Sequence, residues 1–298
     1  MAKKGLQKKT RIANKILTVV FSLVSLLYLY PLVMMVLNSF KKKAFISRAP
    51  FALPTDKMFA GLANYELGIA RTNFWGSMVW SVVITVLSVF LILLCTSMCA
   101  WFISRVVNGW TKLVYLLCIF SMVVPFQMVM FTLSKLANTV QLNTPWTIPI
   151  VYLGFGAGLA VFMFTGYMRS CPIAIEESAM MDGASYTRVL FTIVLPLAVP
   201  TIATITLFTA VNYWNNYMGP MLYINEPGLK PLQLYLREII LEQSDMVLSS
   251  QSAEDQLNIS SEGVRSATII ASTLPILVVY PFIQKYFIKG IMIGSVKG

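Results

Sequence analysis

The sequence contains no histidine, only four cysteines, and few charged residues, since Asp, Glu, Lys and Arg make up 12% of its 298 residues. The lack of histidine excludes His-based metal sites and Ser-His-Asp or Cys-His catalysis, and four cysteines do not make a disulfide-stapled secreted fold. A soluble chain carries about 25% charged residues, because it must cover its surface in water. With 57% apolar residues and a mean hydropathy of +0.72, this chain must expose most of its surface to lipid.

Long uncharged stretches indicate where the chain crosses the membrane. A helix needs about 20 residues to span about 30 Å of hydrocarbon, and each stretch provides one crossing. Residues 82–95 are apolar on all sides, unlike the alternating strands of a membrane barrel. We therefore predict an all-α integral membrane protein with one transmembrane domain over residues 1–298. Its six helices are expected at about 16–37, 77–103, 113–134, 146–168, 197–218 and 266–285.

The basic residues predict an orientation with both termini in the cytoplasm. In this orientation the cytoplasmic side carries thirteen basic and three acidic residues, and the outer side carries ten basic and nine acidic residues. Cytoplasmic loops of membrane proteins are enriched in Lys and Arg. The basic run at residues 41–43 lies on the outer side and is the exception. Because the basic residues flank membrane spans, we expect contact with lipid and no binding of nucleic acid.

The cytoplasmic connection at residues 170–196 is predicted to form a small helix–turn–helix. Pro172 suits the start of a helix, and residues 173–181 have good helix propensity. Gly183 supplies the left-handed conformation that commonly follows the end of a helix. A second helical piece is expected over residues 184–195. By contrast, the extracytoplasmic loop at residues 219–264 is expected to hold a short amphipathic helix and a polar stretch.

The charges of this cytoplasmic connection leave two interpretations. An amphipathic loop that rests among the lipid headgroups is one of them. Interfacial helices are normally rich in Lys and Arg, however, whereas the first short helix carries Glu176 and Glu177 and no basic residue. This pattern favours a basic protein partner. Pro196 and Pro200 follow, so we expect a bend at the entry to the fifth span.

Two segments of this connection resemble the EAA signature of ABC importer permeases. They are Glu-Ser-Ala-Met-Met-Asp-Gly-Ala at 177–184 and Ile-Val-Leu-Pro at 193–196, and only Ser178 departs from the pattern, as a small residue in place of Ala. The resemblance implies the type I ABC importer permease fold, with this element as the coupling helix seated in a groove of an ATPase. The implied coupling residues are Glu176, Glu177, Ser178, Ala179, Asp182, Gly183, Ala184, Leu195 and Pro196.

Other motifs resemble the carbohydrate-importing subgroup, in which the maltose-type inner permeases are the general relatives. These motifs are Pro125-Phe126-Gln127, Leu142-Asn143-Thr144, Tyr213-Trp214-Asn215, Gln284-Lys285-Tyr286-Phe287, Lys289-Gly290 and Val296-Lys297-Gly298. The segments Pro231-Leu232-Gln233 and Leu236-Arg237-Glu238 resemble the branch associated with uptake of complex oligosaccharides. The implied substrate is therefore a carbohydrate, and an oligosaccharide in particular.

The resemblance also implies partners in a bacterial cytoplasmic membrane. The chain would pair with a second homologous permease, two cytoplasmic ABC ATPases and an extracytoplasmic sugar-binding protein. Glu177 would meet a basic residue of the ATPase, and Gly183 would allow close approach at the turn. The chain has no Gly-x-x-x-x-Gly-Lys-Ser/Thr loop. We therefore expect ATP and Mg²⁺ on the ATPases, and no cofactor, metal or enzyme activity in this chain. The C-terminal Lys-Gly segment either touches the ATPases or is a solvated tail.

Apart from Lys285, the last residue of the sixth, the six predicted spans contain no Asp, Glu, Lys or Arg. Transporters coupled to ions or protons typically keep such residues within the membrane, so their absence favours a neutral substrate and an external source of energy. Uncharged polar side chains are present, and amides and aromatic rings suit sugar hydroxyls and sugar rings. An interfacial aromatic belt is the alternative. The candidate substrate-path residues are Gln127, Asn212, Tyr213, Trp214, Asn215, Asn216 and Tyr217.

Three glycines lie in the predicted fourth span, at positions 154, 156 and 158, and they favour close helix packing over a broken helix. Two rival functions remain. One is a secondary transporter or channel that needs no ATPase, which intramembrane charges or an inverted repeat would favour, although neither is found. The other is an ABC permease for amino acids or another small neutral solute.

Overall fold

The computed structural model describes residues 2–71, 73–241 and 260–295, and over these ranges it is helical without a β-strand. The all-α prediction is thus confirmed. The chain divides into two compact units, Met1–Thr72 with Ile239–Ala271, and Asn73–Glu238 with Ser272–Gly298. Much of the predicted polar stretch after residue 241, and the C-terminal Val296-Lys297-Gly298, lie outside the described residues.

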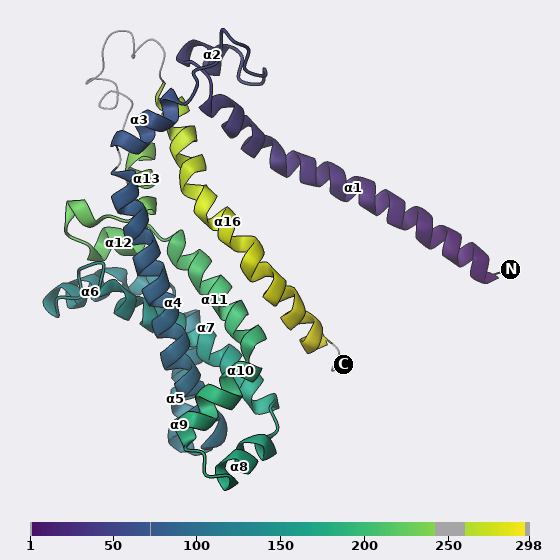
Figure 1. The fold of residues 1–298 in the computed structure, drawn as a ribbon, viewed down its shortest axis with the longest axis vertical. Helices are drawn as coiled ribbons and strands as arrows, with labels where there is room; N and C mark the ends of the chain where they lie inside the picture. Colours follow the sequence, from purple (N-terminus) through teal and green to yellow (C-terminus); the bar gives the residue numbers. More distant parts are fainter. Residues whose placement is uncertain (1, 72, 242–259, 296–298) are drawn as a thin grey trace. The chain divides into compact units, whose positions relative to one another are not determined.

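Four helices are long and apolar enough to cross a membrane. They are Ala13–Ser39 of α1 (Ala2–Ser39), α4 (Phe74–Arg105), α7 (Ile148–Ser170) and Ser261–Phe282 of α16 (Ser261–Ser295). Two further candidate spans are bent pairs. These are α5 (Gly109–Val123) with α6 (Phe126–Thr139), and Tyr186–Leu197 with α11 (Val199–Trp214). The described helices therefore give the predicted six spans when each bent pair counts as one (Figure 1).

The third predicted span, residues 113–134, is not one straight helix. The chain bends by 108° between α5 and α6. Pro125 lies at this break, in an extended conformation before α6. Proline has no N–H to continue a helix and restricts the residue before it to extended conformations, which accounts for the break. The bend places the N-terminus of α6, with Gln127, close to the end of α11, where the candidate pocket lies.

Within the second unit, α4 packs most extensively against α7, while α5 also lies on α7 and α11 lies on α4. The buried side of α4 consists largely of Ser, Thr and Ala, which let helix backbones approach closely. Several of the hydroxyl groups bond within the helix, as Ser88 Oγ does when it donates to Ile84 O at 2.6 Å. Large apolar side chains such as Val86 and Phe90 are exposed instead. This inside-out distribution is suited to a helix surrounded by lipid.

Two of the three glycines in α7 are needed for close packing. A Cβ at Gly156 would collide with Ile92 Cδ1, and a Cβ at Gly158 would lie 2.5 Å from the backbone oxygen of Cys118. A Cβ at Gly154 would meet nothing within 4 Å. Since α7 is continuous from Ile148 to Ser170, the packing interpretation is confirmed for Gly156 and Gly158.

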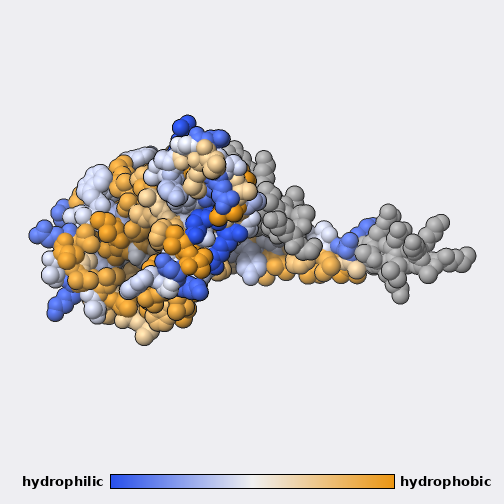
Figure 2. Space-filling model, turned by 90° about the horizontal axis from the view of Figure 1, so that it is seen from below, coloured by the Kyte–Doolittle hydropathy of each residue, from blue (hydrophilic) through white to orange (hydrophobic). Residues whose placement is uncertain are grey.

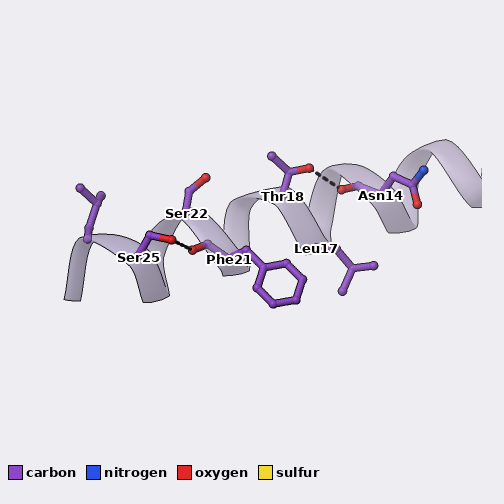
Figure 3. Close-up of a pocket in the computed structure, with 7 residues that line it drawn as sticks. Asn14, Leu17, Thr18, Phe21, Ser22 and Ser25 are labelled. Carbon is purple, nitrogen blue, oxygen red and sulfur yellow. Dashed lines mark hydrogen bonds between the residues drawn. The ribbon is translucent and has the colours of Figure 1, made fainter. Parts of the chain in front are cut away.

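Apolar residues dominate much of the surface that Figure 2 shows. The side chains of α1 are an extreme case, since Leu27 and Tyr28 are 71% and 76% exposed. Figure 3 shows a shallow hollow on this helix, lined by residues of α1 alone. Two of its hydroxyl groups donate to the backbone of the same helix, Thr18 Oγ1 to Asn14 O and Ser25 Oγ to Phe21 O, both at 2.8 Å. The hollow is thus one face of a helix and not a binding cavity.

The basic run at residues 41–43, which disagreed with the predicted orientation, lies in the first unit, and the contacts of Lys41 account for part of it. It contains α2 (Lys43–Arg48) and α3 (Ala63–Arg71). Lys41 is fully buried, and its Nζ donates to Ala49 O and Pro50 O, both at 2.9 Å, and to Asn38 Oδ1 at 3.0 Å. Burial lowers the pKa of this amine. Lys41 therefore holds the segment that follows α1 in place, and it is not a free loop charge.

Candidate functional site

The predicted end of the first coupling-loop helix is confirmed. Helix α8 (Ile173–Met181) is followed by Gly183 with φ +85°, a left-handed conformation that suits glycine. The Gly183 N–H donates to Met180 O, and the Ala184 N–H donates to Ala179 O, both at 3.0 Å. This pair of bonds is a Schellman motif, which satisfies carbonyls that the helix end would otherwise leave free. The direction of the chain after α8 is thereby defined by backbone bonding.

The second piece differs from the single helix predicted over residues 184–195. It consists of α9 (Tyr186–Val189), a π-helix at Leu190–Val194 and α10 (Leu195–Leu197). Pro196 is the second residue after the π-helix and cannot donate to a backbone carbonyl, so the regular bonding of the helix is interrupted there. The chain then bends by 79° before α11, which confirms the predicted bend. This irregular segment connects the loop to the fifth span.

Glu176 lies inside the molecule, with 1% of its surface exposed. Arg105, at the end of α4, donates through Nε to both carboxylate oxygens, at 3.0 and 3.1 Å, and also through Nη2. Trp101 Nε1 donates to Glu176 Oε2 at 3.0 Å. A buried carboxylate requires such charged and hydrogen-bonded partners. The prediction that both neighbouring carboxylates face a protein partner is therefore wrong for Glu176, whose charge is neutralised within this chain.

Trp101 contacts both arms of the loop. Besides its bond to Glu176 in α8, its ring lies 6.1 Å from the ring of Tyr186 in α9. Sequence reasoning did not identify Trp101 or Arg105. The available signal was that Arg105 is a lone cation at the end of an uncharged stretch, but its partner lies 71 residues away. Together, Trp101 and Arg105 attach the loop to α4.

The remaining coupling-loop residues separate into an exposed and a half-buried set. Glu177, Ser178, Asp182, Gly183 and Pro196 are exposed. Ala179, Ala184 and Leu195 are half-buried and pack against the hydrophobic core. Exposed apolar side chains accompany the acidic ones, and Met181 is 88% exposed. An exposed surface with both apolar and acidic groups suits a protein partner with a basic rim.

At another part of the second unit, the structure brings most of the predicted substrate-path residues into one pocket. The pocket has a volume of about 550 Å³. Six predicted residues line it, which are Gln127, Asn212, Tyr213, Asn215, Asn216 and Tyr217. The lining also includes Phe126, Tyr152 and Phe155, which sequence reasoning did not select. A pocket of this size with several polar groups and aromatic walls is typical of a small-molecule site.

Aromatic rings form much of the pocket wall. The Tyr213 ring stacks on that of Tyr152, with centroids 4.2 Å apart and planes within 6°, and Tyr213 Oη donates to Tyr152 O at 2.7 Å. Phe126 meets Phe155 edge to face at 5.1 Å. Stacked and edge-to-face rings attract each other, so these pairs stabilise the positions of the aromatic side chains in the pocket wall.

The end of α11 differs from the predicted helical run through Tyr217. The helix stops at Trp214, so Asn212 and Asn216 do not share a face of one helix. Asn216 Oδ1 instead accepts from the Gly219 N–H at 2.9 Å, at the start of α12 (Met218–Tyr223). Tyr217 immediately precedes α12. The two residues reach the same pocket as Asn212 because the chain turns there.

Trp214 does not line this pocket. It is 6% exposed and borders a different, apolar hollow of about 460 Å³, together with Thr85 of α4 and Pro275 of α16. The prediction that places Trp214 beside the other polar residues is therefore wrong, because its side chain points to another face of α11. A further hollow of about 720 Å³ lies between α5, α6 and α7, and its lining is mostly apolar. The pocket with the amides is the one suited to a hydroxylated ligand.

Comparison with known proteins gives one family. The model of the "Binding-protein-dependent transport system inner membrane component" family matches residues 92–293. The probable starch degradation products transport system permease protein AmyC of Thermoanaerobacterium thermosulfurigenes is 30% identical, over 97% of this chain and 99% of that protein. The polygalacturonan/rhamnogalacturonan transport system permease protein YtcP of Bacillus subtilis (strain 168) is 41% identical over 46% of this chain and 48% of that protein.

A solved structure is similar over almost the whole chain. It is a crystal structure of a bacterial ABC transporter involved in the import of the acidic polysaccharide alginate. The similarity covers 93% of this chain and 97% of that one, with a TM-score of 0.80 and 27% sequence identity.

Proposed function

Because this chain belongs to the family of binding-protein-dependent transport system inner membrane components, we infer that it carries a carbohydrate across the bacterial cytoplasmic membrane as the permease subunit of an ABC importer. The prediction made from residues 177–184 and 193–196 is confirmed at the level of the family. The names of its relatives, which include starch degradation products and polygalacturonan, support a carbohydrate and favour an oligosaccharide.

The observation that carries the substrate class is the 550 Å³ pocket. Its side chains offer amide donors and acceptors at Gln127, Asn212 and Asn215, beside aromatic faces at Tyr213 and Phe155. Among the described residues, no Asp, Glu, Lys or Arg lines it. Hydroxyl groups match such amides, and the apolar faces of sugar rings match the aromatic walls. We propose this pocket as part of the path of the carbohydrate.

We propose that α8 and the exposed residues around it seat in an ATPase subunit on the cytoplasmic side. Glu177 then pairs with a basic residue of the ATPase, and Gly183 permits close approach at the turn. The buried ion pair between Glu176 and Arg105 supports a mechanical role for the loop, because it attaches α8 to α4. Movement of the ATPase would thus reach α4, which packs along α7, the helix that carries Tyr152 of the pocket.

The proposed mechanism is alternating access. ATP binding draws two ATPases together, and the coupling helices of this chain and of a second homologous permease carry that motion into the membrane. The ATPase must hold α8 throughout the cycle so that its movement is transmitted to the permease, while ATP shifts the equilibrium because it binds one state of the ATPases more tightly than the other. The ATPases bind ATP and Mg²⁺ and carry out hydrolysis. An extracytoplasmic binding protein delivers the carbohydrate to the permease.

Reconstitution of the complete complex in proteoliposomes tests this function. Uptake of a labelled oligosaccharide, presented with the binding protein, should require hydrolysable ATP on the ATPase side and should stop with a non-hydrolysable analogue. An imposed proton or sodium gradient should have no effect. Uptake driven by such a gradient without ATPases would identify a secondary transporter instead. ATP-driven uptake restricted to amino acids would identify an importer of another small solute.

A further inference from the structure

A basic residue, Arg237, lies beside the mouth of the pocket. Its guanidinium carbon is 5.5 Å from the ring centroid of Tyr217, and Tyr217 lines the pocket. Arg237 belongs to α13 (Leu232–Leu241) and is half-buried. This helix is held in place by its buried leucines and by a bond of 2.8 Å from the Leu232 N–H to Ser81 Oγ of α4. The position of Arg237 is therefore defined by packed structure.

Arg237 differs from the neighbouring basic residue on the same segment. Lys230 Nζ lies 2.6 Å from Glu238 Oε1 and is thus neutralised by its own chain. Across the described ranges, two salt bridges form, Arg105–Glu176 and Lys230–Glu238, and Arg237 takes part in neither. Arg237 instead stacks on the aromatic face of Tyr217. No hydrogen bond or salt bridge among the described residues uses its N–H donors, so a guanidinium held over an aromatic ring in this way can still donate to another ligand.

We propose that Arg237 binds a carboxylate of the transported carbohydrate, so that the substrate class is an oligosaccharide containing uronic acid. This inference rests on the proposed function and refines it. A guanidinium binds a carboxylate through two parallel hydrogen bonds, and a half-buried site strengthens them relative to water. No charged side chain lines the pocket within the described ranges, and Arg237 is the cation in contact with one of its lining residues, Tyr217. The hydroxyl groups and rings of the sugar then meet the amides and aromatic rings deeper in the pocket.

The absence of charge in the spans is compatible with this assignment. That absence favoured a neutral substrate because transporters coupled to ions or protons typically keep charged residues within the membrane. Arg237 lies outside the predicted spans, in the loop at residues 219–264, and Tyr217 connects it to the pocket. A carboxylate can therefore be recognised at the mouth while the rest of the molecule contacts uncharged walls.

The test is uptake by the complete importer in proteoliposomes, with its binding protein in saturating amount. The probes are trimers of galacturonate, mannuronate and glucuronate, each compared with its methyl ester, which has the same size and no charge. The variant Arg237→Gln is compared with Lys135→Gln. Lys135 is an exposed cation on α6, a helix bonded to the α12 region through Ser134 Oγ and Leu222 O at 2.8 Å. The control therefore removes one positive charge from a residue that does not line the pocket.

For at least one trimer, the wild type should carry the acid faster than its ester. Arg237→Gln should lower the acid-to-ester ratio by about 10- to 100-fold, the range expected for a charged hydrogen bond. Arg237→Lys should restore part of the ratio, and Lys135→Gln should leave it unchanged.

An unaltered ratio in Arg237→Gln would overturn the proposal, and so would a wild type that carries neutral oligosaccharides but no uronate. Equal losses for acid and ester would overturn it too, since they indicate docking of the binding protein. Failure of ATP-driven uptake for every carbohydrate would instead refute the proposed function.

Discussion

The two candidate sites of the second unit use charge in opposite ways. At the coupling loop, a carboxylate is buried and matched by Arg105 and Trp101, and the chain beyond it is defined by a Schellman motif. At the pocket, the wall that the described residues form is uncharged, and several amides remain exposed. A buried ion pair resists displacement because separating it strands a charge. An uncharged polar wall can exchange one hydroxyl group for another at little cost, which suits a path through which a ligand moves.

The largest expected effect comes from breaking the buried pair. Arg105→Ala leaves the Glu176 carboxylate without its cation in the interior, which costs about 3–5 kcal/mol. The apparent melting temperature of the purified complex should fall sharply, and transport should cease. The double variant Arg105→Leu with Glu176→Leu should recover most of the thermal stability, because no charge is then stranded. A single variant that melts like the wild type would contradict the role given to this pair.

A smaller loss of stability is expected from a substitution at the pocket wall. Gly156→Ala places a Cβ against Ile92 Cδ1 and 2.9 Å from Tyr213 Oη. Overpacking of this kind costs about 1–3 kcal/mol and should displace the stacked tyrosines. Thermal melting and the apparent KM for the carbohydrate measure the two effects. Gly154→Ala is the matched control on the same helix, because its Cβ meets nothing within 4 Å. Equal behaviour of the two variants would argue against tight packing of α7.

A substitution at the turn of the coupling loop should lower the stability of the protein less than it lowers transport. Gly183→Val forces a β-branched residue into a left-handed conformation, at φ +85°, which costs about 1–2 kcal/mol. Membrane insertion should persist while transport per ATP hydrolysed falls. Gly166→Ala is the control, since a Cβ there also meets nothing within 4 Å and the site lies in a regular helix. Undiminished sugar uptake in Gly183→Val would count against the coupling role.

The smallest effect on stability is expected at the exposed carboxylate. Glu177→Lys changes an exposed side chain, so the free energy of unfolding should change by less than about 0.5 kcal/mol. Coupling should nevertheless fail, because two like charges then meet at the ATPase surface, which costs several kcal/mol. Thermal unfolding of the complex measures the effect on stability, and transport together with ATPase activity of the reconstituted complex measures the effect on coupling. Comparison with Arg105→Ala distinguishes a residue that acts on a partner from one that acts within the chain.

The sequence predicted most of the loop because its signals are local. A glycine after a helix and a proline before one act through the backbone of their immediate neighbours, so the end of α8 and the bend near Pro196 could be located. The role of Glu176 could not be predicted in this way. Its environment depends on a residue 71 positions away, and adjacent Glu176 and Glu177 look alike in sequence.

The pocket shows the same limit. The residue types suited to a sugar were identified from composition, but helical spacing assigned Trp214 to the wrong side and placed Asn216 on a helix that ends before it. Tyr152 and Phe155 gave no local signal, since aromatic residues are frequent in membrane helices. The convergence of α6, α7 and α11 on one pocket follows from the 108° bend after α5, whose angle no sequence pattern specifies.

The sequence alone determined that the chain is a helical membrane protein with a helix–turn–helix in the connection at residues 170–196, because hydropathy, proline and glycine act over a few residues. Only the tertiary structure decided which carboxylate is buried, which aromatic rings line the pocket, and where Arg237 lies. These features arise from contacts between segments distant in the chain, and close packing, not residue type, selects their partners.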